Sequence, residues 1–294
     1  MTKPFENYIE KRVQNFNIKL ENLLQNLEAP SQLKDSMKYS ITAGGKRIRP
    51  VLVMASYEAF KTDIEKTYTI ASALEMIHTY SLIHDDLPAM DDDDYRRGSP
   101  TNHKKFDEAT AILAGDALLT YAFEIITDDM NLNIEEKLYA ISKLSKASGP
   151  EGMIAGQILD IEAESKNVNL DELVTIHSKK TGALINFAVH LGAYLAGATR
   201  EQLYYLDEYA SNIGLLFQVQ DDILDIIGDE DKIGKPVGSD EELDKSTYPN
   251  LLGLKGAKKY RDMYAEEAKV ALYNAGIKDS YLKDLIDYIA QRDH

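Results

Sequence analysis

The chain has 294 residues, no cysteine, and 49 acidic against 33 basic side chains, for a formal net charge of −16. The missing thiols exclude disulfide scaffolds, thiolate zinc sites and cysteine nucleophiles, and the acidic balance argues against a nucleic-acid partner. With 44% hydrophobic residues but only 17 glycines and 8 prolines, the composition indicates a globular, helix-rich protein.

The composition of the first residues and the length of the apolar runs indicate in which cell compartment the protein is expected. Residues 1–16 are polar and charged and lack the apolar core of a signal peptide. No apolar run approaches the roughly 20 residues that cross a bilayer. We therefore expect a soluble, cytoplasmic protein without integral membrane contact.

Apolar residues recur at spacings of three and four along nearly the whole chain, whereas the alternation typical of strands is hard to find. One helix is expected from Asp63, as its N-cap, to Asp86, and a long one from Arg200 to Gly228. Glycine, proline and charged residues separate the helices at residues 43–50, 87–102, 148–152 and 228–249. The sequence predicts an all-α fold, a large helical bundle, in a single domain over residues 1–294.

A first aspartate cluster, HDDLPAMDDDD over residues 84–94, ends an apolar helix. On an ideal helix Asp85 and Asp91, six residues apart, point to different sides. Pro88 disrupts the helix between them, so a bulge or helix end could bring Asp91 back beside Asp85. An unbroken helix through Asp94 would contradict this interpretation.

A second cluster, QDDILD over residues 220–225, lies inside an apolar helix, where Asp221 and Asp225 point the same way. Like charges near apolar surface need a cation, and oxygen ligands without cysteine favour Mg²⁺, Mn²⁺ or Ca²⁺ over zinc. Mg²⁺ in particular completes its shell with water and substrate phosphate. A solvated acidic turn is the other interpretation of residues 91–94, but two clusters on apolar helices favour a metal site.

Basic side chains, although scarce, gather in the segments between helices. They are Lys46, Arg47, Arg49, Arg96, Arg97, Lys235 and Lys245. Arginine binds phosphate as a planar fork and lysine as a point charge, which suggests two phosphate sites, one held by metal and one by basic residues. Neither a Walker loop nor a dinucleotide fingerprint is present. His78 lies on the same helix side as Asp85, and the Lys180-Thr181-Gly182 segment begins or breaks a helix.

In chain order, GGKRIRP at 44–50, DDLPAMD at 85–91 with RRG at 96–98, KTG at 180–182, and FQVQDDILD at 217–225 resemble the motifs of the trans-isoprenyl diphosphate synthases. The resemblance extends from about residue 44 to residue 248. SLIHDDLPAMD at 81–91 and KSTYP at 245–249 are particularly similar to bacterial farnesyl diphosphate synthases.

The resemblance implies a helical bundle around a deep central cavity, a homodimer, and three Mg²⁺ ions that grip an allylic diphosphate. Asp85, Asp91 and Asp221 would be direct metal ligands, and Asp86, Asp222 and Asp225 would act directly or through water. The allylic diphosphate would be held by Arg96, Lys180, Lys235 and Lys245, and isopentenyl diphosphate by Lys46, Arg49, His78 and Arg97.

The implied reaction condenses isopentenyl diphosphate with dimethylallyl and then geranyl diphosphate. Thr181 and Gln218 would offer oxygen dipoles to the carbocation, and closure of residues 228–249 would exclude water. Tyr80 and Ser81, five and four residues before Asp85, would set product length, with Tyr80 as the pocket floor of a C15 enzyme. The alternatives are a geranylgeranyl diphosphate synthase, a non-catalytic prenyl-diphosphate-binding subunit, and a terpene cyclase.

Overall fold

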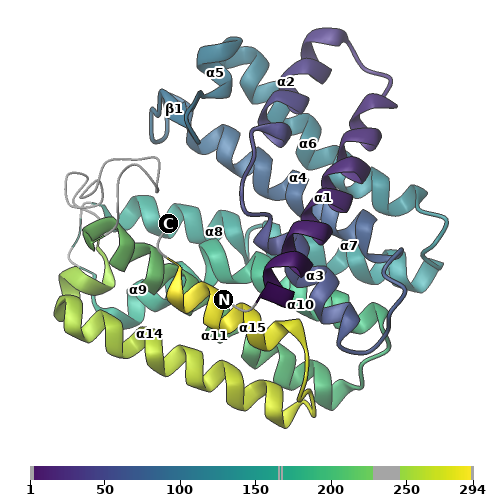
Figure 1. Cartoon of the computed structure of the whole chain (residues 1–294). Coiled ribbons are helices and arrows are strands. Elements are labelled where there is room, and N and C mark those ends of the chain that lie inside the picture. The colour runs from purple at the N-terminus through teal and green to yellow at the C-terminus, as the bar shows by residue number, and fades with distance from the viewer. Residues whose placement is uncertain (1–2, 165, 167, 228–245, 293–294) are drawn as a thin grey trace. The chain divides into compact units, whose positions relative to one another are not determined.

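The computed structural model describes residues 3–164, 166, 168–227 and 246–292 (Figure 1). Within these ranges the elements are helices, apart from one antiparallel pair of two-residue strands, β1 (Tyr95–Arg96) and β2 (Ser99–Pro100). The all-α prediction is therefore confirmed.

The helices follow one another with short connections in most places. In chain order they are α1 (Lys3–Gln25), α2 (Ser31–Thr42), α3 (Ile48–Glu58), α4 (Thr67–Asp85), α5 (Asn102–Lys105), α6 (Glu108–Asp128), α7 (Ile134–Ser148), α8 (Met153–Ala163), α9 (Leu170–His177), the π-helix η1 (Ser178–Gly182), α10 (Ala183–Leu195), α11 (Arg200–Ile227), α14 (Tyr248–Asn274) and α15 (Tyr281–Gln291).

The chain forms two compact units. The N-terminal unit consists of Glu6–Met54 and Asp63–Ile141, and the C-terminal unit of Met1–Phe5, Ala55–Thr62 and Ser142–His294. A single domain over residues 1–294 stays a prediction.

In the N-terminal unit, α4 packs along α6. Leu74 and Ile77 of α4 are fully buried, and α6 turns Ala111, Ala114 and Gly115 inward. These small side chains allow close approach: a Cβ atom on Gly115 would lie only 2.1 Å from Nε2 of His84. The α6 helix therefore serves as the packing surface for the helix that ends in the first aspartate cluster.

Helix α6 corrects one expectation, because by length and composition alone it could cross a membrane. The sequence prediction missed it because Asp116 and Glu124 interrupt its apolar runs. The same helix packs against α4 and α2, and its Leu118 is fully buried. Such a composition also suits the core helix of a globular unit.

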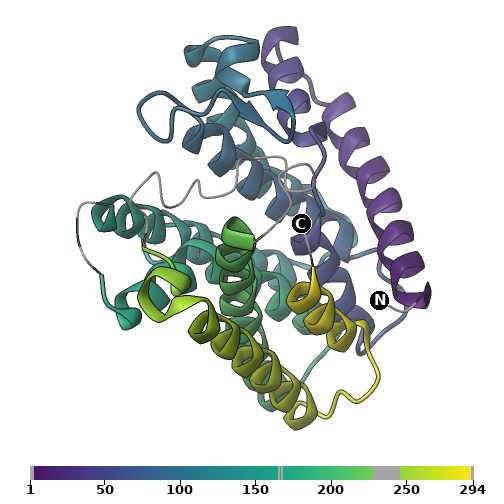
Figure 2. The same ribbon diagram turned by 60° about the vertical axis from the view of Figure 1, so that its left-hand side comes forward.

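In the C-terminal unit, α11 packs against α10, α14 and α15. Figures 1 and 2 show α14 running alongside it. The apolar stripe of α11 is fully buried at Leu206, Ile213 and Leu216, and the Tyr209 hydroxyl donates to the Leu282 carbonyl oxygen over 2.8 Å. The predicted long helix is thus confirmed, ending at Ile227.

Three local predictions need correction. Asp63 is not the N-cap of α4, because its carboxylate accepts from the Glu65 amide in a turn and the helix begins at Thr67. The break at residues 43–50 ends early, because α3 begins at Ile48 and accommodates Pro50 in its first turn, where proline needs no amide hydrogen. The KTG segment neither begins nor ends a helix, because it belongs to the π-helix η1, which continues from α9 into α10.

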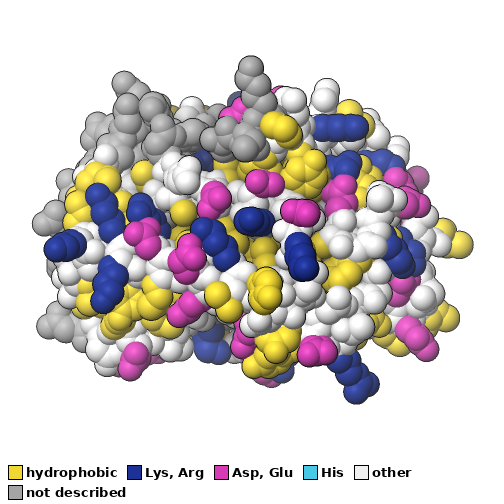
Figure 3. Space-filling model, turned by 60° about the horizontal axis from the view of Figure 1, so that its bottom comes forward, with side chains coloured by type: hydrophobic (Ala, Val, Ile, Leu, Met, Phe, Trp, Pro, Cys, Tyr) yellow, Lys and Arg dark blue, Asp and Glu magenta, His cyan; other side chains and the backbone are white. Residues whose placement is uncertain are grey.

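Charged side chains of both signs are interspersed on the face of the molecule shown in Figure 3. Hydrophobic side chains lie among them. On this face, lysine and arginine do not gather into one patch.

Candidate active site

The first aspartate cluster begins where α4 ends, at Asp85. The chain then turns back, with the Met90 amide donating to the Leu87 carbonyl oxygen over 2.8 Å and the Asp91 amide to that of Asp85 over 2.8 Å. The predicted helix break is confirmed, and the backbone of Asp91 lies beside Asp85. Asp91 itself is exposed and Asp85 is half-buried.

Asp86, next to this turn, is buried and paired with Arg96. The Arg96 Nε donates to Asp86 Oδ1 over 2.7 Å, and Nη2 lies 2.6 Å from the same oxygen. Burial raises the pKa of Asp86, and Arg96 partly offsets that shift. Asp86 is therefore less available than Asp85 or Asp91 as a metal ligand, and Arg96 is held at the cluster.

Arg96 and Arg97 point to different partners because they lie on a tight hairpin. Arg96 pairs with Ser99 across the β1–β2 ladder, and both loop residues, Arg97 and Gly98, have positive φ angles of 53° and 74°. This is the geometry of a type I′ turn, which glycine accommodates readily. The turn directs the neighbouring arginines to separate parts of the N-terminal unit.

Arg97 reaches the glycine-rich loop, where Nη1 donates to the Gly44 carbonyl oxygen. Gly45, which lies against the end of the Arg97 side chain, has a φ of 115°, a backbone conformation that residues other than glycine rarely adopt. The hairpin thus connects the first aspartate cluster, through Arg96, with the basic loop, through Arg97.

Arg47, at the end of that loop, and Arg49, in the first turn of α3, have different environments. Arg47 is buried and bonds to Glu75 and to the Ile41 carbonyl oxygen, which marks it as a structural residue. Arg49 Nη1 donates to His78 Nε2 over 3.3 Å. The structure therefore brings together two of the residues predicted to bind isopentenyl diphosphate.

His78 is held in its neutral form. Burial is the largest cause, and the charges of Arg49 and Arg97 add to it, so the pKa of His78 falls well below its usual value. Because arginine can only donate, Nε2 must present its lone pair to Arg49 and the ring proton belongs on Nδ1. His78 consequently orients Arg49 without adding charge.

Tyr80 is buried on α4, and its hydroxyl has no hydrogen-bond partner among the described residues. Burial raises the pKa of this phenol to about 12, and the Asp85 charge contributes to the shift. Its ring contacts His84 edge-on at 5.7 Å between centroids. Ser81 differs, because its hydroxyl donates back to the His78 carbonyl oxygen over 2.9 Å.

In the C-terminal unit the second cluster lies on an unbroken helix, and its three aspartates have unequal exposure. The Asp221 side chain is 42% exposed and paired with Arg292, whereas Asp222 and Asp225 are only 5% and 4% exposed. Asp222 Oδ2 accepts from the Tyr248 amide over 2.9 Å. Only Asp221 among these three is substantially exposed in the described part of the chain, so a metal-binding face shared by Asp221 and Asp225 stays a prediction.

The predicted catalytic pair is brought together across two helices. Thr181 Oγ1, on η1, donates to Gln218 Oε1, on α11, over 2.8 Å. A π-helix inside a longer helix is frequently found at functional sites because it displaces side chains from the regular α-helical positions. Close packing holds η1 here, since a Cβ on Gly214 of α11 would lie 3.0 Å from the Gly182 Cα.

Lys180 pairs with a residue that sequence reasoning missed. Its Nζ lies 2.5 Å from Oδ2 of Asp160 on α8. The signal was a carboxylate four residues after Gly156 in an otherwise apolar segment, MIAGQILDIEA. Gly156 also has a structural reason, because a Cβ there would meet the Lys180 amide nitrogen at 2.1 Å.

The sequence matches known proteins along its whole length. The polyprenyl synthetase family pattern covers residues 30–279. The chain is 50% identical to a farnesyl diphosphate synthase of Geobacillus stearothermophilus, with 98% of each chain covered, and 53% identical to one of Escherichia coli, with 88% and 89% covered. It also resembles the solved geranyltransferase of Legionella pneumophila, with 35% identity, a TM-score of 0.86, and 99% and 98% of the chains covered. This chain belongs to the polyprenyl synthetase family.

Members of this prenyltransferase family generally depend on Mg²⁺, and the donor set fits that ion. Asp85, Asp91 and Asp221 offer hard carboxylate oxygens, which Mg²⁺ prefers. Among the described residues, no group of three or more acidic or histidine side chains could hold a metal by itself. Asp85 and Asp91 belong to the N-terminal unit and Asp221 and Asp225 to the C-terminal one, so the four-aspartate ligand set stays a prediction.

Some predicted parts of the polyprenyl synthetase site lie outside the described residues. These are Lys235, Lys245 and most of the 228–249 segment that was predicted to close over the site. Lys46 is half-buried in the basic loop.

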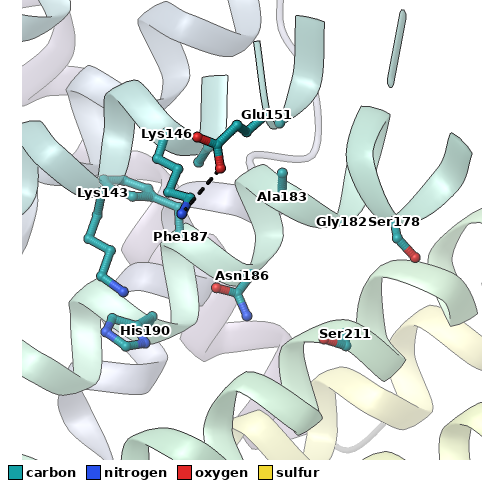
Figure 4. Close-up of a pocket in the computed structure, with 12 residues that line it drawn as sticks. Lys143, Lys146, Glu151, Ser178, Gly182, Ala183, Asn186, Phe187, His190 and Ser211 are labelled. Atoms are coloured by element: carbon teal, nitrogen blue, oxygen red, sulfur yellow. Dashed lines mark ion pairs between the residues drawn. The ribbon is translucent and has the colours of Figure 1, made fainter. Parts of the chain in front are cut away.

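A separate cavity of about 410 Å³ lies in the C-terminal unit between α7, α10 and α11 (Figure 4). Lys146 on its rim lies 3.2 Å from Glu151, and His190 Nδ1 lies 2.7 Å from Asp207 Oδ1. None of the residues lining it has a predicted role in the polyprenyl synthetase reaction.

Proposed function

We propose that this polyprenyl synthetase is a farnesyl diphosphate synthase, which condenses isopentenyl diphosphate with dimethylallyl diphosphate and then with geranyl diphosphate to give (2E,6E)-farnesyl diphosphate. The farnesyl diphosphate synthases to which the chain is about half identical support this product.

The observation that carries the proposal is the broken end of α4. The Asp91 amide bonds to the Asp85 carbonyl oxygen, so two carboxylates six residues apart occupy one turn. In the same unit, Arg96 pairs with Asp86 and Arg97 bonds to the glycine-rich loop. Carboxylates for a metal and cations for phosphate are thus assembled within one unit.

The metal would be held by Asp85 and Asp91 and by Asp221 and Asp225, with three Mg²⁺ ions assembled around the allylic diphosphate. When bound, Mg²⁺ supplies electrostatic stabilisation of the charge that grows on the departing diphosphate. Among these four aspartates, Asp91 is exposed and the Asp221 side chain is 42% exposed, whereas Asp225 is buried, so Asp91 and Asp221 are more accessible ligands than Asp225.

The diphosphates would be held by two sets of cations. Isopentenyl diphosphate would bind Lys46, Arg49, His78 and Arg97, and the Arg49–His78 contact supports this set. The allylic diphosphate would bind Arg96, Lys180, Lys235 and Lys245. Arg96 and Lys180 each already lie beside one carboxylate, Asp86 and Asp160, which keeps them oriented before substrate arrives.

In the reaction, the allylic C–O bond breaks and its electron pair stays with the diphosphate. The alkene of isopentenyl diphosphate attacks the resulting cation, and the diphosphate leaving group takes the proton that is then lost. Thr181 and Gln218 would direct oxygen dipoles at the cation, and their mutual hydrogen bond fixes both side chains. No protein nucleophile is needed.

Tyr80 would limit the product to C15. Its ring is buried and bulky, which suits a wall that stops a growing hydrocarbon chain. Ser81, one residue closer to Asp85, would line the same path. A geranylgeranyl diphosphate synthase, in which the chain grows past this point, is the alternative.

We further propose a cytoplasmic homodimer. Large apolar side chains are exposed on α6 and α7 of the N-terminal unit, including Leu113 at 59%, Ile134 at 76% and Leu138 at 65%. Exposed apolar side chains of this size are typical of subunit interfaces. Light scattering should give twice the mass of the chain, and a monomer at micromolar concentration would contradict this.

The experiment incubates the protein with Mg²⁺, dimethylallyl diphosphate and radiolabelled isopentenyl diphosphate, and sizes the dephosphorylated products by chromatography. A C15 alcohol is expected. A C20 alcohol would identify the geranylgeranyl enzyme and remove Tyr80 as the floor, and no elongation would favour the non-catalytic subunit. Products formed from an allylic diphosphate without isopentenyl diphosphate would indicate a terpene cyclase.

A further inference from the structure

Arg292, which follows the last residue of α15, is fixed to one turn of α11. Its guanidinium carbon lies 4.1 Å from the centre of the Phe217 ring, and Nη2 donates to the Phe217 carbonyl oxygen over 2.9 Å. Its own carbonyl oxygen accepts from Gln220 Nε2 over 2.9 Å. With only 6% of its side chain exposed, Arg292 is anchored from three sides.

From this position the guanidinium also pairs with Asp221. Nη2 of Arg292 donates to Asp221 Oδ1, so an exposed carboxylate of the second cluster is already neutralised by a cation of the same chain. Arginine remains protonated at any physiological pH and has no lone pair to offer a metal. A divalent cation at Oδ1 would therefore compete with the guanidinium for the same oxygen.

The guanidinium has room to move away. Arg292 and Gln220 line a cavity of about 690 Å³ between α11, α14 and α15. Its walls carry both charges, and Glu266 and Asp287 already lie 2.9 Å and 3.5 Å from Lys269, so the cavity offers space for the guanidinium rather than an attracting charge.

We propose that Arg292 is an internal counter-ion that competes with the divalent metal for Asp221, so that metal binding at the second aspartate cluster requires Arg292 to release it. The proposal rests on the proposed function, in which Asp221 is a metal ligand. Because linkage is reciprocal, the metal weakens the Arg292 contact by the same factor by which Arg292 weakens metal binding.

The test measures Mn²⁺ binding to the purified full chain without diphosphate, by the loss of the free-ion signal in electron paramagnetic resonance. Arg292→Gln should lower the Mn²⁺ concentration at half-saturation by at least about fivefold, the low end of typical coupling between sites. Arg292→Lys keeps a cation there and should restore a value near that of the wild type. A purely structural role for Arg292 predicts unchanged or weaker binding instead.

Thermal unfolding gives a second readout. In EDTA, Arg292→Gln should unfold at a lower temperature, because Asp221 loses its partner, and Mn²⁺ should raise its Tm more than that of the wild type. Arg261→Gln is the matched control, since Arg261 lines the same cavity but pairs with Asp262, 2.7 Å away. It should leave the Mn²⁺ midpoint unchanged.

Asp221→Asn separates the two proposals. If it does not weaken Mn²⁺ binding, Asp221 is not a ligand and the metal assignment fails. If it does, but Arg292→Gln binds Mn²⁺ no more tightly than the wild type, the metal assignment stands and the competition is overturned. Absence of binding to both the wild type and Arg292→Gln would overturn the competition as well.

Discussion

In the N-terminal unit the helix that carries Asp85 stops, and the chain folds back until the Asp91 amide reaches the Asp85 carbonyl oxygen. In the C-terminal unit α11 continues through Asp221 and Asp225 without a break. A turn presents an exposed carboxylate to solvent, whereas a packed helix buries two of its three aspartates. Aspartate carboxylates therefore reach solvent through a backbone break in the N-terminal unit and through helical periodicity in the C-terminal unit.

The two clusters also differ in their counter-ions. Arg96, on a hairpin ten residues after Asp86 in the sequence, pairs with that buried carboxylate. Arg292 comes from the far end of the chain and pairs with the exposed Asp221. The first cluster is thus left with its outer aspartate, Asp91, exposed to solvent, while the exposed member of the second carries an ion pair.

The largest expected effect tests whether both clusters bind metal. Asp91→Ala and Asp221→Ala should each lower turnover by about 10³-fold, because each removes a ligand of the Mg²⁺ ions whose charge stabilises the leaving diphosphate. Turnover is measured with radiolabelled isopentenyl diphosphate. Asp94→Ala, an exposed neighbour that pairs with Lys104 over 2.7 Å, is the control and should remain active.

The same variants should differ in stability. Asp91 is exposed, so its loss should change the free energy of unfolding by less than about 0.5 kcal/mol. Asp221→Ala removes the partner of the buried Arg292 and should cost about 1–3 kcal/mol in chemical denaturation. Equal stability of the two variants would contradict the view that Asp221, unlike Asp91, stabilises the fold through an ion pair. Near-normal turnover in both variants would contradict the metal assignment.

A buried histidine in the C-terminal unit predicts a pH dependence of stability. His177 is stacked on Tyr248, with ring centroids 5.9 Å apart, and burial is the main cause that lowers its pKa from 6.5 to about 4. As pH falls below 6.5, His177 becomes protonated in the unfolded chain but stays neutral in the folded one, so stability decreases. At pH 5 this loss is about 2 kcal/mol relative to pH 7.5.

Urea unfolding of the wild type and of His177→Phe at both pH values measures that loss. The variant should lose about 2 kcal/mol less than the wild type between pH 7.5 and pH 5. His78 of the N-terminal unit remains in both proteins and cancels in the comparison. An identical pH dependence of the two proteins would show that His177 is protonated as readily when folded as when unfolded.

The smallest expected change in the free energy of unfolding is at Tyr80. Because its hydroxyl has no partner in the part of the chain that the structure describes, Tyr80→Phe should leave stability unchanged or raise it by about 1 kcal/mol, and the product should stay C15. Tyr80→Ala should instead lengthen the product towards C20 and beyond, as measured by chromatography. A C15 product from Tyr80→Ala would remove Tyr80 from the control of chain length.

Much of this protein was determined by local sequence. Helical periodicity predicted the all-α fold and the long helix ending at Ile227, and Pro88 predicted the break before Asp91. The family resemblance of the KTG and FQ motifs implied a shared role for Thr181 and Gln218, and a hydrogen bond joins them. These features follow from interactions within a few residues or from motifs, so they leave a signal in the sequence.

Tertiary structure alone decided which of several chemically equivalent side chains serves which purpose. Arg47 is buried against Glu75 whereas Arg49 contacts His78, and nothing in the sequence around these two neighbouring arginines distinguishes them beforehand. The contacts of Lys180 with Asp160 and of Asp221 with Arg292 join residues 20 and 71 positions apart. Such pairings depend on how helices pack, and packing is set by the whole apolar core rather than by the residues that form the pair.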